Sequence, residues 1–363
     1  MLQRIVTHIN VTYSEQTGQT VEYHFVGGST RAPSRKTTAP LERTSLQKVI
    51  DQYWEYVRGA ISGGLLEAED GVVHEDFIGQ LESRGNEIAR TLFSKEQQTE
   101  LWAVAAQSDI VLINTNLDEV PWEALFCPNA GEDGEFFSQN CVIQRQIFGD
   151  DFEADIQREE PNSWLICLDP ELVREEEAKG WRIVDELERH ALPLYTTSNS
   201  RELAKRVKGS ALIHWICEHD LERGLRLGRD VFYSDRDIET HRFPPHCLLF
   251  MLSCSTGRSG AGMAAFSSRI ASASGCTVVA PSSVVAAQEA VGFVASIHRI
   301  LEDRTVEQLC DVWTLLKNPL GGRRVAGRFS VQECYLLWFG IYGDCGVSIG
   351  TRRPADGDQD RAA

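Results

Sequence analysis

At 363 residues the chain is long enough to bury a full hydrophobic core, as one large domain or two smaller ones. Hydrophobic residues make up 42% of the sequence and charged residues 25%, which is typical of an ordinary globular protein. The formal net charge is −17 with no lysine- or arginine-rich run, so nucleic acid and anionic membranes, which need a basic face, are excluded as expected direct partners.

The N-terminal region predicts a β-hairpin followed by helices. Alternating side chains in Arg4–Tyr13 and Thr20–Val26 are typical of two short strands, without the continuous apolar core of a signal peptide. The Gly-, Ser- and Pro-rich segment Gly27–Arg43 predicts an exposed connection. Helical spacing then appears in Ser45–Ala60, in Glu75–Phe93 and in residues 94–106. We therefore expect a hairpin and linker in residues 1–43 and a helical lead-in over residues 44–106.

From residue 109 onward, apolar runs of strand length alternate with helical patterns. The expected strands are Asp109–Asn114, Cys141–Ile147, Trp164–Leu168, Leu194–Thr196, Ala211–Cys217, Cys247–Leu252, Thr277–Ala280 and Cys334–Ile341, with a hairpin arm at Gly224–Phe232. The expected helices are Glu171–His190, Ser200–Val207, Asp235–His241, Met263–Ser274, Ala286–Glu302 and Thr305–Asn318. This alternation predicts an α/β fold with a mainly parallel sheet covered by helices on both faces. The domain is expected to span residues 44–350, with an acidic loop at Phe148–Pro161 and a disordered polar tail at residues 351–363.

Ten cysteines occur in the chain, without any CxxC pair that would indicate a zinc ribbon, and most of them lie in apolar runs. Such cysteines are typical of the reduced core of a cytoplasmic protein. No run is long enough to span a membrane, and no cofactor or metal is expected. Cys254 differs from the others because its neighbours are Ser, Thr and Gly.

Cys254 and His219 are the candidate catalytic residues. Each follows an apolar strand, Cys247–Leu252 and Ala211–Cys217 respectively, and ligands collect at the carboxyl ends of parallel strands. A thiol beside an imidazole can act as nucleophile and general base. The turn that follows Cys254 is rich in small residues, so its backbone N–H groups can stabilise an oxyanion.

Five segments, in order, resemble the caspase-like CHAT domains, which belong to the clan of caspases, metacaspases and separase. They are Val120–Phe126 (VPWEALF), Ala211–Asp220 ending in the His, Gly224–Ile238, Leu249–Gly257 (LFMLSCSTG) and Ile341–Asp344 (IYGD). The resemblance covers roughly Glu75–Gly346 and leaves the N-terminal hairpin outside. It implies a cysteine endopeptidase with a Cys254/His219 dyad and an oxyanion site formed by the backbone at Asp220 and Ser255.

The resemblance also implies a biological setting. Family members act in bacterial defence or cell death, are switched on by an activating protein or an upstream protease, and cut a specific protein such as a pore-former. By that analogy the partners of this chain would be a pore-forming or regulatory protein substrate, encoded nearby, and an activator.

The sequence departs from the family at two places. His219 is followed by Asp220 where the family commonly has Gly, and the added carboxylate favours the charged imidazole, which raises its pKa. The segment expected to line the substrate pocket, represented by Ser283, Val284 and Gln288, contains no carboxylate before Glu289. Because an unpaired guanidinium in an apolar pocket is costly, we expect a neutral P1 residue in place of Arg or Lys.

Alternatives remain open at this stage. The chain could be an inactive caspase-like scaffold that binds a partner through the same groove, or a thiol-dependent acyltransferase or amidase. His214 is a minor rival for the base but fits a core histidine better. Trp122 and Glu123 are expected to lock a sheet edge and a loop, and Ser253 and Ser255 lack the context of a serine nucleophile.

Overall fold

The computed structural model describes residues 4–14, 20–26, 35–64, 73–131, 134–146, 163–188, 194–196, 199–208, 210–220, 222–253, 261–282, 285–302, 308–323 and 331–347. Three expected features lie outside these residues: the acidic loop Phe148–Pro161, the polar tail, and the thiol of Cys254.

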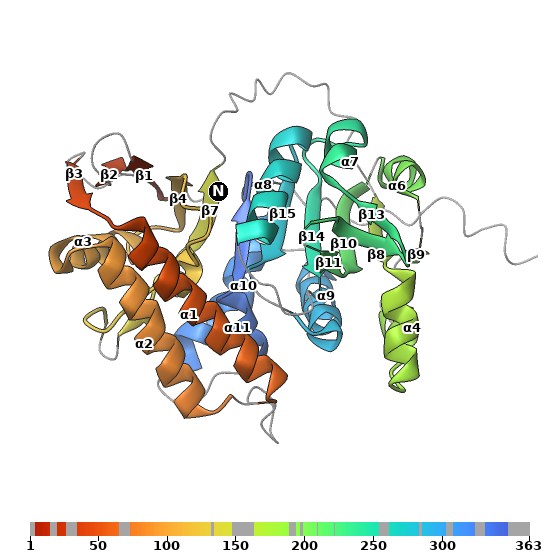
Figure 1. The fold of residues 1–363 in the computed structure, drawn as a ribbon, viewed down its shortest axis with the longest axis horizontal. Coiled ribbons are helices and arrows are strands. Elements are labelled where there is room, and N and C mark those ends of the chain that lie inside the picture. The colour runs from red at the N-terminus through yellow and green to blue at the C-terminus, as the bar shows by residue number, and fades with distance from the viewer. Residues whose placement is uncertain are drawn as a thin grey trace, which may run out of the picture.

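The centre of the molecule is an eleven-stranded sheet in the order β3-β2-β1-β4-β7-β16-β15-β14-β10-β8-β9 (Figure 1). The strands are β1 Val6–Ser14, β2 Thr20–Val26, β3 Arg35–Pro40, β4 Ile110–Thr115, β7 Val142–Gln146, β8 Ser163–Leu168, β9 Leu194–Thr196, β10 Ser210–Cys217, β14 Leu248–Ser253, β15 Thr277–Pro281 and β16 Phe339–Tyr342. Most neighbours pair in parallel, as the strand–helix alternation predicted.

Strand direction reverses once inside the main body of the sheet. β15 and β16 pair antiparallel, whereas β15, β14, β10, β8 and β9 are mutually parallel and so are β16, β7, β4 and β1. The carboxyl ends of β10 and β14 therefore meet at one rim, and those of β4 and β7 lie at the opposite rim.

The N-terminal hairpin is hydrogen-bonded into this sheet. β1 pairs in parallel with β4 from Val6 opposite Ile110 to Val11 opposite Thr115, and β2 continues the edge antiparallel. β3 pairs with β2, so residues 35–40 form a strand where the sequence predicted an exposed connection. The division at residue 43 stays a prediction.

Helices cover both faces, as predicted (Figure 1). Side chains of α6 Ser200–Val207, α7 Asp235–Thr240 and α8 Ala261–Ser274 build the core on one face. The core on the other face includes side chains of α1 Arg43–Ser62, α2 Glu75–Leu92, α3 Lys95–Ala105, α4 Pro170–Ala178, α5 Ile183–Glu188, α9 Ala287–Glu302, α10 Leu309–Arg323 and α11 Val331–Leu336. On β10, Leu212 and Ile216 face one core and Ile213 and Trp215 face the other, which explains the unbroken apolar run.

Two expected elements differ in the structure. The predicted helix Glu171–His190 is divided into α4 and α5, because Gly180 adopts a φ of 88° that ends the first helix. The predicted strand Cys334–Ile341 begins as the end of α11 and becomes β16 only at Phe339. An all-apolar run gives no periodicity with which to separate the two.

Smaller strands complete the description. β11 His219–Asp220, β12 Gly224–Gly228 and β13 Val231–Tyr233 form a three-stranded sheet, and β5 Phe126–Cys127 pairs with β6 Glu135–Phe136. The 3-10 turn η1 Trp122–Ala124 lies between β4 and β5.

Candidate active site

The ends of β10 and β14 lie side by side. The two strands pair in parallel from Leu212 opposite Leu248 to Cys217 opposite Ser253. His219 comes two residues after Cys217, and Ser253 is the last described residue before Cys254. The predicted neighbourhood of the two strands is confirmed. The position of the Cys254 side chain lies outside the described residues, as do Ser255, Ser283 and Val284.

His219 is a buried imidazole, with 6% of its surface exposed. Its ring lies 5.5 Å from that of Phe266 on α8, measured between centroids. Burial lowers the His219 pKa to about 4, although the carboxylates of Asp220 and Asp235 act in the opposite direction. Asp220 raises the His219 pKa, as expected, but burial lowers it by more, so the expectation of a raised pKa is wrong. At neutral pH the ring is uncharged and can accept a proton.

The residue at position 220 closes the turn of the hairpin that carries His219. Asp220 Oδ1 accepts hydrogen bonds from the backbone N–H groups of Glu222, at 2.9 Å, and Arg223, at 3.0 Å. Those bonds, with Glu222 first, lower the Asp220 pKa. Gly224 lies opposite Asp220 with a φ of 100°, and a Cβ there would collide with the carbonyl oxygen of Tyr233. The Asp220 side chain is exposed, so the departure from the family's Gly does not crowd the hairpin.

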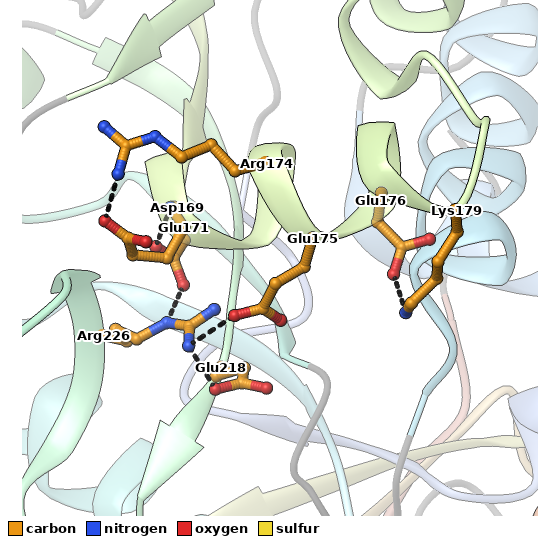
Figure 2. A network of polar contacts seen from close by, with 8 residues as sticks. All are labelled: Asp169, Glu171, Arg174, Glu175, Glu176, Lys179, Glu218 and Arg226. Atoms are coloured by element: carbon orange, nitrogen blue, oxygen red, sulfur yellow. Dashed lines mark hydrogen bonds and ion pairs between the residues drawn. The ribbon is translucent and has the colours of Figure 1, made fainter.

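Behind the hairpin, one arginine contacts three carboxylates, which we call the Arg226 cluster: Asp169, Glu175, Glu218 and Arg226 (Figure 2). Arg226 Nε donates to Asp169 Oδ2, and Nη1 lies 2.7 Å from Glu218 Oε2 and 3.1 Å from Glu175 Oε1. Burial raises the pKa of Asp169 and of Glu218 despite the arginine. Sequence reasoning missed this cluster, although Asp169 before Pro170 is a helix-start signal at the end of a strand.

A second arginine joins two of the segments that carried the family resemblance, and we call Glu123, Arg145 and Tyr342 the Arg145 cluster. Arg145 on β7 donates two hydrogen bonds to Glu123, at 2.5 and 3.2 Å, and a third to the Tyr342 hydroxyl at 3.2 Å. Burial alone would lower the Arg145 pKa, but Glu123, Tyr342 and Asp118 together act in the opposite direction, and the pKa is raised. Glu123 is 1% exposed and joins the turn η1 to β7, which confirms the expected role of locking a loop. Because β7 is an inner strand, the expected role at a sheet edge is wrong.

The other candidates separate into core and surface. His214 is fully buried, with its Nε2 3.0 Å from Nε2 of His298 on α9 and its ring stacked on Phe250. It is therefore a core histidine and cannot meet a substrate. Gln288 is exposed in the first turn of α9.

Cysteines, metals and membranes can be assessed over the described part of the chain. There, nine cysteines are buried and unbridged. No group of three or more His, Cys, Asp or Glu side chains in these residues could hold a metal ion. None of the helices there combines the length and the apolar character needed to cross a bilayer.

Solved structures with a similar fold include two of the Saccharomyces cerevisiae separase–securin complex. They align with 93% of this chain at TM-scores of 0.50 and 0.52 and at 11% and 10% identity. The fold is caspase-like. This chain spans 30% of the separase chain.

Gingipain R (RgpB), an Arg-specific cysteine proteinase of Porphyromonas gingivalis, aligns with 80% of this chain and 81% of its own at 12% identity and a TM-score of 0.45. No protein-family model matches the sequence, and no curated protein matches it.

Proposed function

We propose that the protein is a CHAT-type cysteine endopeptidase in which Cys254 is the nucleophile and His219 the base. One observation carries the proposal: a buried, uncharged imidazole lies just past β10, beside the end of β14, where the chain continues into Cys254. Consecutive Cα atoms are about 3.8 Å apart and neighbouring strands about 4.8 Å apart, so we expect the Cys254 thiol to lie close to the His219 ring.

The chemistry follows from these two groups. His219 takes the proton of the Cys254 thiol, and the sulfur attacks the scissile carbonyl carbon. The tetrahedral oxyanion accepts hydrogen bonds from backbone N–H groups, assigned here to Asp220 and Ser255. The C–N bond breaks, the protonated His219 gives its proton to the leaving amine, and a thioester remains. Water, deprotonated by His219, then releases the acid and restores the thiol.

Substitution of the dyad tests the proposal. Cys254→Ala and His219→Ala should each abolish cleavage of a protein substrate and leave the melting temperature near that of the wild type. His74→Ala, which alters an exposed histidine before α2, is the matched control and should keep full activity. Cleavage by either dyad variant would refute the assignment.

The substrate is a specific protein, and we propose a neutral P1 residue because residues 282–288 offer no carboxylate to pair with a basic side chain. A pore-forming or regulatory protein encoded nearby remains the candidate substrate. A positional-scanning peptide library should show cleavage after apolar residues. Strong cleavage after Arg would overturn this specificity and leave the dyad intact.

Activation of the peptidase by a protein partner or by an upstream protease is part of the proposal. Its place is the cytoplasm, which the nine buried, unbridged cysteines of the described residues fit. The separase of the fold comparison is itself seen bound to securin. Activity of the purified chain should therefore rise when the products of neighbouring genes are added.

The alternative function is a non-catalytic scaffold that binds a partner. It was suggested by Asp220, which stands where CHAT domains commonly have Gly. The exposed Asp220 side chain is bound to the hairpin turn, so its presence is explained without a loss of catalytic function. A peptide acyloxymethyl ketone separates the two functions, because selective labelling of Cys254 requires an activated thiol. Absence of labelling would favour the scaffold.

A further inference from the structure

We propose that Arg226 is a positioning residue for His219: it fixes the hairpin β11–β12 on the ends of β8 and β10 and so holds the imidazole in its reactive place. The inference rests on the proposed function, because it assigns a role within the same site.

Arg226 contacts Glu218, the residue before His219, through both its backbone and its side chain. The Arg226 backbone N–H donates to the Glu218 carbonyl at 2.8 Å, while its guanidinium binds the Glu218 carboxylate. The preceding residue, Leu225, pairs with His219 across the hairpin. Both the backbone and the side chain of Arg226 therefore restrain the segment that carries the imidazole.

Arg226 is anchored by Asp169. Asp169 has a fully buried side chain at the end of β8, and its Oδ1 accepts from the Glu171 N–H at 3.0 Å, which caps α4. The Asp169 N–H donates to the carbonyl of Ile216 on β10 at 3.0 Å. Asp169 is thus fixed to two strands of the central sheet. Through its ion pair with Asp169, Arg226 holds the hairpin β11–β12 against those strands (Figure 2).

In the described part of the chain, no carboxylate orients the His219 ring directly. Among the described residues its Nδ1 has no hydrogen-bond partner. The two acids adjacent in sequence are engaged elsewhere, Glu218 by Arg226 and Asp220 by the turn. A base without an orienting carboxylate depends on its backbone and on packing, here against Phe266. An error of about 1 Å in the position of a catalytic group can cost about a hundredfold in rate.

The cluster offers a matched control. The Glu175 side chain is 47% exposed and contacts the same guanidinium from the solvent side, whereas Asp169 is 0% exposed. Loss of Glu175 leaves the link between Asp169, Arg226 and Glu218 in place. Glu175→Gln should therefore behave as the wild type in every measurement below.

The first measurement does not need activity. In the Cys254→Ala background, the ring carbon and proton signals of His219 are followed by NMR against pH and assigned with His219→Gln. The parent and Glu175→Gln should show one ring signal with a midpoint near 4. Arg226→Met should broaden or split that signal and move the midpoint toward 6.5, as the ring becomes exposed. An unchanged signal and midpoint would overturn the inference.

The second measurement is kinetic. Arg226→Met should lower kcat by about tenfold to a hundredfold with KM changed less than about twofold, and Arg226→Lys should restore part of the loss. If cleavage requires Cys254 and His219 but kcat is unchanged in Arg226→Met, the positioning role of Arg226 is refuted and the proposed function stands. Cleavage that survives Cys254→Ala refutes the proposed function and leaves the NMR result to decide on Arg226.

Discussion

The two arginine clusters use the same chemistry in different surroundings. In the Arg145 cluster the arginine and glutamate side chains are 4% and 2% exposed, and the tyrosine is buried as well. In the Arg226 cluster, exposure rises from 0% at Asp169 through 12% at Arg226 and 22% at Glu218 to 47% at Glu175. A charge cut off from water must keep its partner, whereas a charge near water can be re-solvated. We infer that the first cluster secures the fold and the second sets the position of a reactive group.

Removal of Glu123 should have the largest effect. Glu123→Ala leaves the Arg145 guanidinium buried without its carboxylate, and the free energy of unfolding should fall by about 3–5 kcal/mol. Urea denaturation of the purified variant measures this loss. A fall below about 1 kcal/mol would mean that water reaches Arg145, and the contrast between the clusters would disappear.

Arg226→Met should cost less stability than Glu123→Ala. Of the carboxylates it leaves behind, Glu218 and Glu175 reach solvent, and the buried Asp169 keeps its hydrogen bond from the Glu171 N–H. The expected fall is therefore about 1–3 kcal/mol by the same denaturation experiment. A larger loss than that of Glu123→Ala would reverse the assignment of roles.

Phe266→Ala tests the cover over His219. Burial keeps the His219 pKa at about 4, below the ordinary 6.5. The imidazole therefore stays unprotonated down to about pH 4, and cleavage should persist to that pH. Because the unfolded chain binds this proton first, His219 withdraws stability as the pH falls from 6.5 toward 4. Removal of the Phe266 ring admits water and should move the acid limb of kcat/KM upward by about one pH unit. Phe266→Leu keeps an apolar cover and should shift the limb less; an unmoved limb in Phe266→Ala contradicts the role of burial.

The smallest effect is expected at an exposed pair on α4. Arg174 lies 2.7 Å from Glu171 with its side chain 70% exposed, so Arg174→Ala should change the free energy of unfolding by less than about 0.5 kcal/mol. This variant gives the loss of stability expected for an exposed ion pair, against which both clusters are compared. A loss of about 2 kcal/mol here would show that exposure does not determine how much an ion pair stabilises this protein.

Local signals predicted much of this fold. The apolar run Cys247–Leu252 and the alternation of strands and helices predicted the class of the sheet, and the ends of β10 and β14 are neighbours as expected. Local signals failed where the decisive contact is distant or the pattern uniform. The run that ends in Phe339 is apolar throughout, and β3 becomes a strand only through its pairing with β2.

The site shows the same limit. His219 was predicted from its place after an apolar strand, but nothing in the spacing of Asp169 and Arg226, 57 residues apart, predicts that they meet. The net direction of the His219 pKa could not be predicted either, because Asp220 is visible in sequence and the burial of the ring is not. The geometry of Cys254 beside His219 stays a prediction.

The reversal of direction between β15 and β16 separates two sets of loops. β4 and β7 end at one rim of the sheet, and β10 and β14 end at the opposite rim. A strand such as β14, with six residues, spans about 20 Å at about 3.3 Å per residue. If the proposed Cys254/His219 site is correct, a regulator bound where β4 and β7 end would lie about a strand's length from it, and its effect would have to pass through the sheet.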